Sequence, residues 1–158
     1  MCRKIIFLLL VFFLLCGCEL TLLEPYKFRY GIDQITNIEI LEQNPVYSSW
    51  DDRFFEIKTL DPAQYEEFLT DLSSVKGQPF VNPPGDSFDL FVFCISYFNG
   101  EKEYISCGNN AYAIPGKGIV MDTYWFSDEK GFDAVISKYL EEDISEKREA
   151  WNKTIMEK

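Results

Sequence analysis

The chain has 158 residues, of which 26% are charged and 16% aromatic, and its formal net charge at pH 7 is −11 with no histidine. The aromatic content favours an ordered core over an intrinsically disordered chain, and the acidity disfavours nucleic acid and anionic lipid head groups as partners. The absence of histidine excludes Ser-His-Asp and Cys-His catalysis, zinc sites with imidazole ligands and histidine acid/base chemistry.

The N-terminal segment has the layout of a secretory signal. Arg3 and Lys4 form a short basic region, and the residues from Ile5 to Leu15 contain no polar side chain. A helix of this length covers only about 16 Å, roughly half of the hydrocarbon core of a bilayer. We therefore expect a cleavable signal rather than a permanent transmembrane helix.

The end of this segment, Leu15-Cys16-Gly17-Cys18, resembles the lipobox of bacterial lipoprotein precursors, which has Leu at −3, a small residue at −2, Gly at −1 and Cys at +1. Cys16 stands where that family usually has Ala, Ser or Thr. The resemblance covers the first 18 residues. It implies that Cys18 takes a diacylglyceryl group, that residues 1–17 are removed as a signal peptide, and that the mature protein is lipid-anchored. The implied location is the extracytoplasmic face of the cell membrane, or the outer membrane if the host has one.

The mature chain is expected to consist of a short tether, residues 18–25, and a single domain, residues 26–158. The seven residues from Glu19 to Pro25 reach at most about 25 Å when extended, so the domain should lie close to the bilayer. Loss of Arg3 and Lys4 with the signal makes the net charge more negative still. A cationic protein partner is one explanation of this charge, and simple solubility is the other.

The first half of the domain is predicted to contain two strands and a helix. The isoleucines between Ile35 and Ile40 fit a strand, and residues 55–58 alternate apolar and charged. A helix should begin at Asp61 as the N-cap, with Gln64 at the capping-box position, and end near Gly77. Its apolar stripe consists of Tyr65, Phe68, Leu69 and Leu72.

The second half is predicted to be richer in strands. After a Pro-rich loop at residues 78–86, residues 89–98 and 101–107 form two strands joined by an Asn99-Gly100 hairpin. A second turn at residues 115–118 separates two further strands, the latter extending to Phe126. A helix capped by Ser127 follows, with an apolar stripe of Phe132, Val135, Ile136, Tyr139 and Leu140.

This order of elements predicts an α+β fold. Hairpin-linked strands with helices set apart favour an antiparallel sheet, here of about five or six strands. We expect the two amphipathic helices to pack on one face of that sheet.

The two cysteines that remain as thiols, Cys94 and Cys107, flank the Asn99-Gly100 turn. A two-residue loop would place them diagonally on one face, whereas a four-residue loop would place them directly opposite each other, within reach of a disulfide. Export favours oxidation. The sequence leaves both the bridge and a pair of small hydrophobic side chains open.

The remaining motifs suggest binding rather than catalysis. Neither a phosphate loop nor a calcium loop is present, and we predict no cofactor, no metal site and no catalytic residue. The favoured function is a non-catalytic interaction module, such as an inhibitor, an immunity protein or an envelope-complex subunit. The alternative is a carboxylate-dependent cell-wall hydrolase, which requires a groove with two carboxyls, one of raised pKa. The candidate binding surface comprises Phe80, Pro83, Pro84, Tyr112 and Trp125. The oligomeric state is left open.

Overall fold

The computed structural model describes residues 25–50, 52–79, 88–122 and 124–156. The predicted signal peptide, the lipobox and Cys18 lie outside these residues, as do Phe80, Pro83 and Pro84. In the part of the chain that is described, no helix has the length and apolar character needed to cross a membrane.

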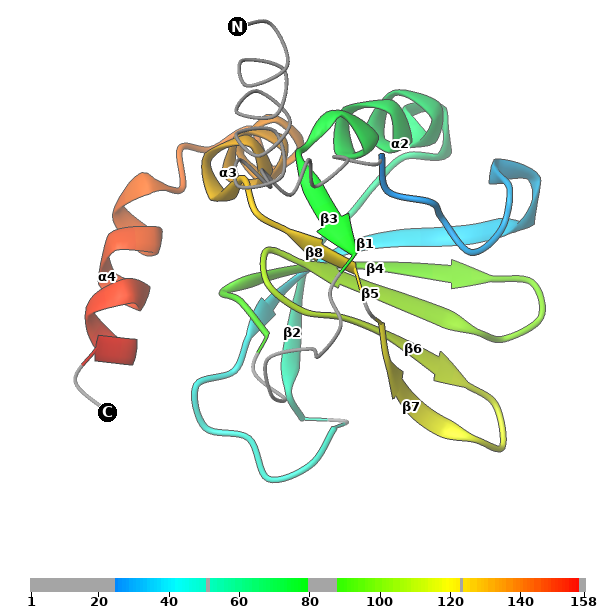
Figure 1. Ribbon diagram of the computed structural model, residues 1–158, viewed down its shortest axis with the longest axis horizontal. Coiled ribbons are helices and arrows are strands. Elements are labelled where there is room, and N and C mark those ends of the chain that lie inside the picture. Colours follow the sequence, from blue (N-terminus) through cyan, green and yellow to red (C-terminus); the bar gives the residue numbers. More distant parts are fainter. Residues whose placement is uncertain (1–24, 51, 80–87, 123, 157–158) are drawn as a thin grey trace, which may run out of the picture.

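The fold is built on a six-stranded antiparallel sheet in the order β2-β1-β4-β5-β6-β7 (Figure 1). The strands of this sheet are β1 (Ile35–Gln43), β2 (Phe54–Thr59), β4 (Phe91–Tyr97), β5 (Lys102–Ser106), β6 (Asn110–Ile114) and β7 (Gly118–Met121). A separate antiparallel pair joins β3 (Gly77–Pro79) to β8 (Tyr124–Phe126). The helices are α2 (Tyr65–Ser74), α3 (Glu129–Leu140) and α4 (Ser145–Met156), with short 3-10 turns η1 (Ile32–Gln34) and η2 (Pro62–Gln64). The predicted α+β class is confirmed.

The central strand β4 is buried on both faces, because each face of the sheet carries its own apolar cluster. Phe91, Phe93 and Ile95 point to the helix-covered face and join the larger cluster. Val92 and Cys94 point to the opposite face and join a smaller cluster. The strand therefore has apolar side chains at nearly every position, as expected for a strand without a solvent-exposed face.

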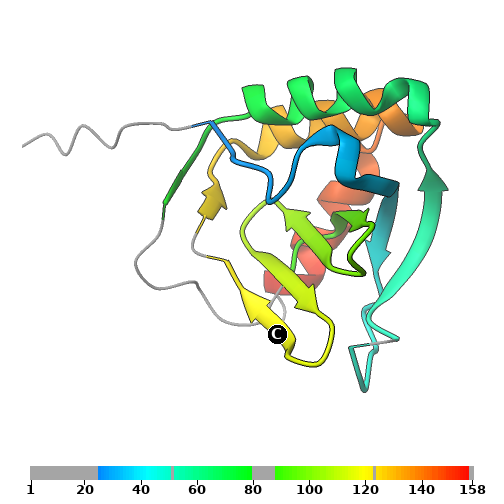
Figure 2. The same cartoon turned by 90° about the vertical axis from the view of Figure 1, so that its right-hand side faces the viewer.

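Helices α2 and α3 lie together on one face of the sheet, as predicted (Figures 1 and 2). Phe68 and Leu72 of α2 and Phe132 and Ile136 of α3 are completely buried in the larger cluster. Phe68 meets Phe93 of β4 at a ring-centroid distance of 4.7 Å. The aromatic and aliphatic stripes of the two helices thus form most of the contact with the sheet.

A third helix, α4, was not predicted. Its outer surface is charged, and of its side chains Arg148 is buried and Trp151 half-buried against the larger cluster. Because the buried side of α4 consists of an arginine and a tryptophan, its sequence lacks the apolar periodicity that indicates an amphipathic helix. The two predicted amphipathic helices are present as α2 and α3, and α4 is an additional helix among the described residues.

The two helix starts differ in how well they match expectation. Asp61 forms the predicted capping box: its carboxylate accepts from the N–H of Ala63, and Gln64 Oε1 accepts from the N–H of Asp61. At the start of α3 the cap is Asp128 rather than Ser127, and its carboxylate accepts from the N–H of Gly131 at 3.0 Å.

The β4–β5 hairpin has neither of the two loop lengths considered from the sequence. Its loop contains three residues, because Tyr97 N–H donates to Glu101 and Gly100 N–H donates to Tyr97. Gly100 adopts a left-handed φ of 82°, which glycine accepts without the strain that a Cβ would cause. This register pairs Cys94 with Tyr104.

Candidate interaction surface

The described part of the β1–β2 hairpin loop, residues 44–50 and 52–53, is held in shape by polar contacts around Asp52. The Asp52 carboxylate accepts from the N–H groups of Ser49 at 2.7 Å and Ser48 at 3.2 Å, and from both of their hydroxyls. The Nδ2 of Asn44 donates to the carbonyl of Asp52 at 2.8 Å. The bonds from Ser49 and Ser48 hold the pKa of Asp52 well below its ordinary value. The carboxylate therefore stays ionised as a fixed part of the loop.

Arg53 fastens this loop to the sheet face opposite the helices. Its guanidinium carbon lies 4.6 Å from the ring centroid of Tyr47, 4.9 Å from that of Phe88 and 5.3 Å from that of Trp50. The Arg53 side chain is buried, and Trp50 in turn packs edge-on against Phe54 at 5.7 Å. These cation–π and ring contacts close the smaller apolar cluster.

The ordered loop and the strand after it present apolar side chains to solvent. Val46 is 83% exposed, Phe55 57%, Tyr47 42% and Ile57 39%, and together we call these four the hairpin surface. Single exposed apolar residues are ordinary on a protein surface, but four on one hairpin are a feature of interaction sites.

Acidic side chains and a bulge shape this hairpin surface. Glu42 pairs with Phe55 across the two strands, and Glu56 is exposed beside it. The register of β2 against β1 shifts at Ile57, which interrupts the free edge of the strand. Because a bulged edge is a poor template for another strand, this surface favours contacts by side chains over addition of a strand.

The most buried carboxylate, Glu103 of β5, serves as an anchor for the N-terminal segment. It has no exposed surface and accepts from the hydroxyls of Tyr26 and Tyr97 and, at 3.4 Å, from the N–H of Arg29. Burial raises the pKa of Glu103. Both carboxylate oxygens are engaged by these partners, so the group ties residues 26–29 to the sheet.

Tyr112, one of the predicted binding residues, belongs to the surroundings of this buried acid. Its hydroxyl donates to Asp122 at 2.9 Å, and its ring lies 4.5 Å from the guanidinium carbon of Arg29. The side chain is half-buried in β6. Of the other predicted surface residues, Trp125 is placed only through its backbone, which pairs with Gln78 in the β3–β8 ladder.

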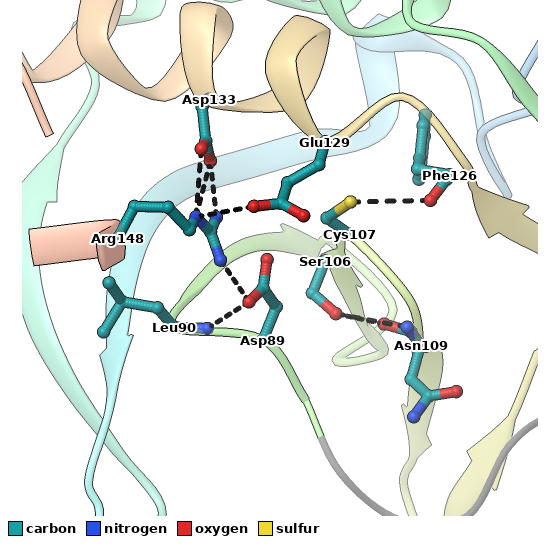
Figure 3. A network of polar contacts seen from close by, with 9 residues as sticks. All are labelled: Asp89, Leu90, Ser106, Cys107, Asn109, Phe126, Glu129, Asp133 and Arg148. Atoms are coloured by element: carbon teal, nitrogen blue, oxygen red, sulfur yellow. Dashed lines mark hydrogen bonds and ion pairs between the residues drawn. The ribbon is translucent and has the colours of Figure 1, made fainter. Parts of the chain in front are cut away.

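A second buried polar network joins α4 to the rest of the domain (Figure 3). The guanidinium of Arg148 bridges Asp133 of α3, with a Nε–Oδ2 distance of 2.9 Å, and Asp89 just before β4, and lies 3.6 Å from Glu129. Burial raises the pKa of Asp89 despite its ion pair with Arg148. Because Arg148 pairs with both Asp133 and Asp89, this network, which we call the Arg148 clamp, holds α4 against α3 and the start of β4.

The two cysteines do not form the disulfide that one hairpin register allowed. Both are free thiols, and the observed register sends Cys94 to the smaller cluster and Cys107 to the helix-covered side. Burial raises the pKa of each thiol to about 12. The Cys107 thiol contacts the carbonyl of Phe126 at 3.5 Å, as Figure 3 shows.

Metal chemistry finds no support among the residues whose positions are described: none of their Cys, Asp and Glu side chains form a group of three or more that could hold an ion.

The hairpin surface was missed from the sequence. Residues 55–58 were predicted as a half-buried strand. The exposure of Phe55 and Ile57 could not be predicted, because it depends on β2 being the edge strand of the sheet.

In comparisons with known proteins, no family model, no curated protein and no solved structure matches the chain.

Proposed function

We propose that this protein is an extracytoplasmic lipoprotein, anchored through Cys18, whose domain binds a protein partner without catalysing a reaction. The hairpin surface carries the proposal for partner binding, since it combines exposed apolar side chains with acidic neighbours on a loop fixed by Arg53. A partner with a basic rim around an apolar centre would complement it.

The buried acids support a binding role rather than the alternative of glycoside hydrolysis. Among the described residues, Glu103 and Asp89 are the carboxyls whose pKa is raised, as that reaction would need for a proton donor. Glu103 is completely buried under two tyrosine hydroxyls, and Asp89 is paired with Arg148. Both carboxyls thus serve the fold.

The lipid anchor is supported by the resemblance of Leu15-Cys16-Gly17-Cys18 to the lipobox. Tyr26, eight positions after Cys18, is 4% exposed and donates to Glu103, so it is fixed to the sheet. Two or more lipid chains hold a protein stably at a membrane, and a tether this short would keep the whole domain at the surface.

Site-directed photocrosslinking in cells tests both parts. A benzophenone amino acid at Phe55 reports on the hairpin surface, and the same probe at Thr70, exposed on α2, is the matched control. We expect one defined protein adduct from position 55 and none from position 70. Cys18→Ala should release the protein from the membrane fraction.

The outcomes separate the two claims. A Cys18→Ala protein that stays in the membrane contradicts the anchor. The same adducts from both positions, or none from position 55 in the anchored protein, contradict the hairpin surface as a binding site.

A further inference from the structure

One end of the sheet gathers three turns, and we call it the turn end. It consists of η1, the β4–β5 turn at residues 98–100 and the β6–β7 turn at residues 115–117. Phe98 N–H donates to the carbonyl of Gln34 at 3.0 Å, and a Cβ on Gly100 would lie 3.3 Å from Cγ of Pro115. The three turns are therefore in contact. They lie on the right in Figure 1, opposite α4, and face the viewer in Figure 2.

Large apolar side chains protrude from this end. Phe98 is 71% exposed and Ile32 is 47% exposed. The turn geometry explains why Asn99 and Gly100 occupy their positions. The side-chain oxygen of Asn99 accepts from the N–H of Glu101, and Gly100 adopts a left-handed φ. It does not require a phenylalanine at the preceding position, so the exposure of Phe98 calls for a binding explanation.

The turn end and the segments that flank it also depart from the acidity of the chain. Residues 25–34, 97–102 and 115–120 contain four basic side chains, Lys27, Arg29, Lys102 and Lys117, and two acidic ones, Asp33 and Glu101. The turn end together with these flanking segments thus has a net charge of +2 in a chain whose net charge is −11. These segments can therefore be attracted to an anionic surface although the chain as a whole is acidic.

The N-terminal segment leads from the tether to the turn end. Tyr26 is bound at Glu103, Tyr30 donates to Glu101 at 3.0 Å, and Gln34 accepts from Phe98. The segment follows β5 towards the hairpin turn. Because the residues between Cys18 and Tyr26 span at most about 25 Å, a lipid on Cys18 would keep this side of the domain within reach of the bilayer.

We infer that the turn end faces the membrane, with Phe98 and Ile32 in the lipid head-group layer and the basic side chains against anionic lipid. The inference rests on the proposed anchor at Cys18. One lipid-linked residue together with apolar and basic side chains gives the two-signal attachment that peripheral proteins use. It also leaves the hairpin surface, on another part of the domain, free for a protein partner.

Depth measurements on vesicles test this orientation. The lipidated protein, carrying Phe98→Cys labelled with nitrobenzoxadiazole, is reconstituted in vesicles of phosphatidylethanolamine and phosphatidylglycerol at about three to one. Ala150→Cys, exposed on α4 at the opposite end, carries the control label, and the unsubstituted protein gives the background from Cys94 and Cys107. We expect a blue shift at position 98, quenching by nitroxide-bearing lipid and loss of quenching by iodide. Position 150 should keep its aqueous spectrum.

Flotation of the same samples separates this inference from the proposed anchor. If the protein floats with the vesicles but both labels stay quenched by iodide, the anchor stands and the turn end does not face the lipid. If position 98 is shielded from iodide only when a second protein is added, the turn end is a protein contact and the inference fails. A lipid-dependent Phe98→Cys signal that weakens in neutral phosphatidylcholine vesicles would confirm both the apolar and the electrostatic parts. A protein that fails to float would overturn the anchor and the orientation together.

Discussion

Replacing Arg148 by Met removes a buried cation but keeps a side chain of similar length. Asp133 and Asp89 then lose their charged partner in an interior where the Arg148 side chain is only 8% exposed. Breaking a buried ion pair at one partner destabilises a protein by about 3–5 kcal/mol. We expect the lower end, about 3 kcal/mol, because the Asp133 side chain is 20% exposed and water can replace part of its bonds. That loss is a large share of the stability of an ordinary domain, about 5–15 kcal/mol.

Urea unfolding followed by tryptophan fluorescence measures this effect on a form that lacks residues 1–18. With a denaturant slope of about 1–3 kcal/mol/M, the midpoint should fall by about 1–3 M. Lys153→Met on the same helix is the matched control, since Lys153 is exposed and pairs only with the exposed Glu149. Adding Asp133→Asn to Arg148→Met should recover part of the loss. Equal midpoints for Arg148→Met and Lys153→Met would refute the clamp.

Three other predictions concern the buried acid, the thiols and a close backbone approach. Burial raises the pKa of Glu103, so above its unfolded value of 4.5 the native state keeps a proton that the unfolded chain releases, and stability falls as pH rises. Glu103→Gln lacks this titration, so the difference in unfolding free energy between parent and variant, measured by urea unfolding, should narrow from pH 4.5 to pH 7. A constant difference would contradict the raised pKa of Glu103. Ellman's reagent should leave Cys94 and Cys107 unreacted in the folded protein and modify both after unfolding; a protein with no free thiol once unfolded would mean that they are bridged. A Cβ on Gly77 would lie 2.5 Å from the Tyr124 ring, so Gly77→Ala should lower the stability by about 1–3 kcal/mol, and an unchanged urea midpoint would contradict this packing.

Local signals in the sequence predicted α2, α3 and the positions of the hairpin turns. The capping residues Asp61 and Gln64 and the apolar stripe through Phe68 lie within a few positions of each other, so their meaning does not depend on distant parts of the chain. The same holds for the Pro115-Gly116 turn, where Gly116 has a φ of 76°.

Features that depend on distant contacts escaped prediction. Residues 119–126 read as one strand, but the chain leaves the main sheet after Met121 and pairs Trp125 with Gln78 of β3 instead. The length of the Asn99-Gly100 loop determined whether Cys94 and Cys107 could form a disulfide, because a change of one residue in a hairpin register moves a side chain to the other face of the sheet. Likewise, the sequence gives no sign that Arg148 is buried, because its partners Asp89 and Asp133 come from other elements of the fold.

The place of β4 in the sheet has a consequence for the time course of folding. Its first neighbour, β1, is about 50 residues away in the sequence, as the pairing of Ile40 with Phe93 shows, and the helix α2 lies between them. The centre of the sheet cannot form until that long loop closes, which costs chain entropy before any strand pairing compensates for it. We therefore expect folding in milliseconds to seconds rather than microseconds. Until β1 and β4 meet, the apolar β4 remains exposed, and the chain is open to aggregation during that interval.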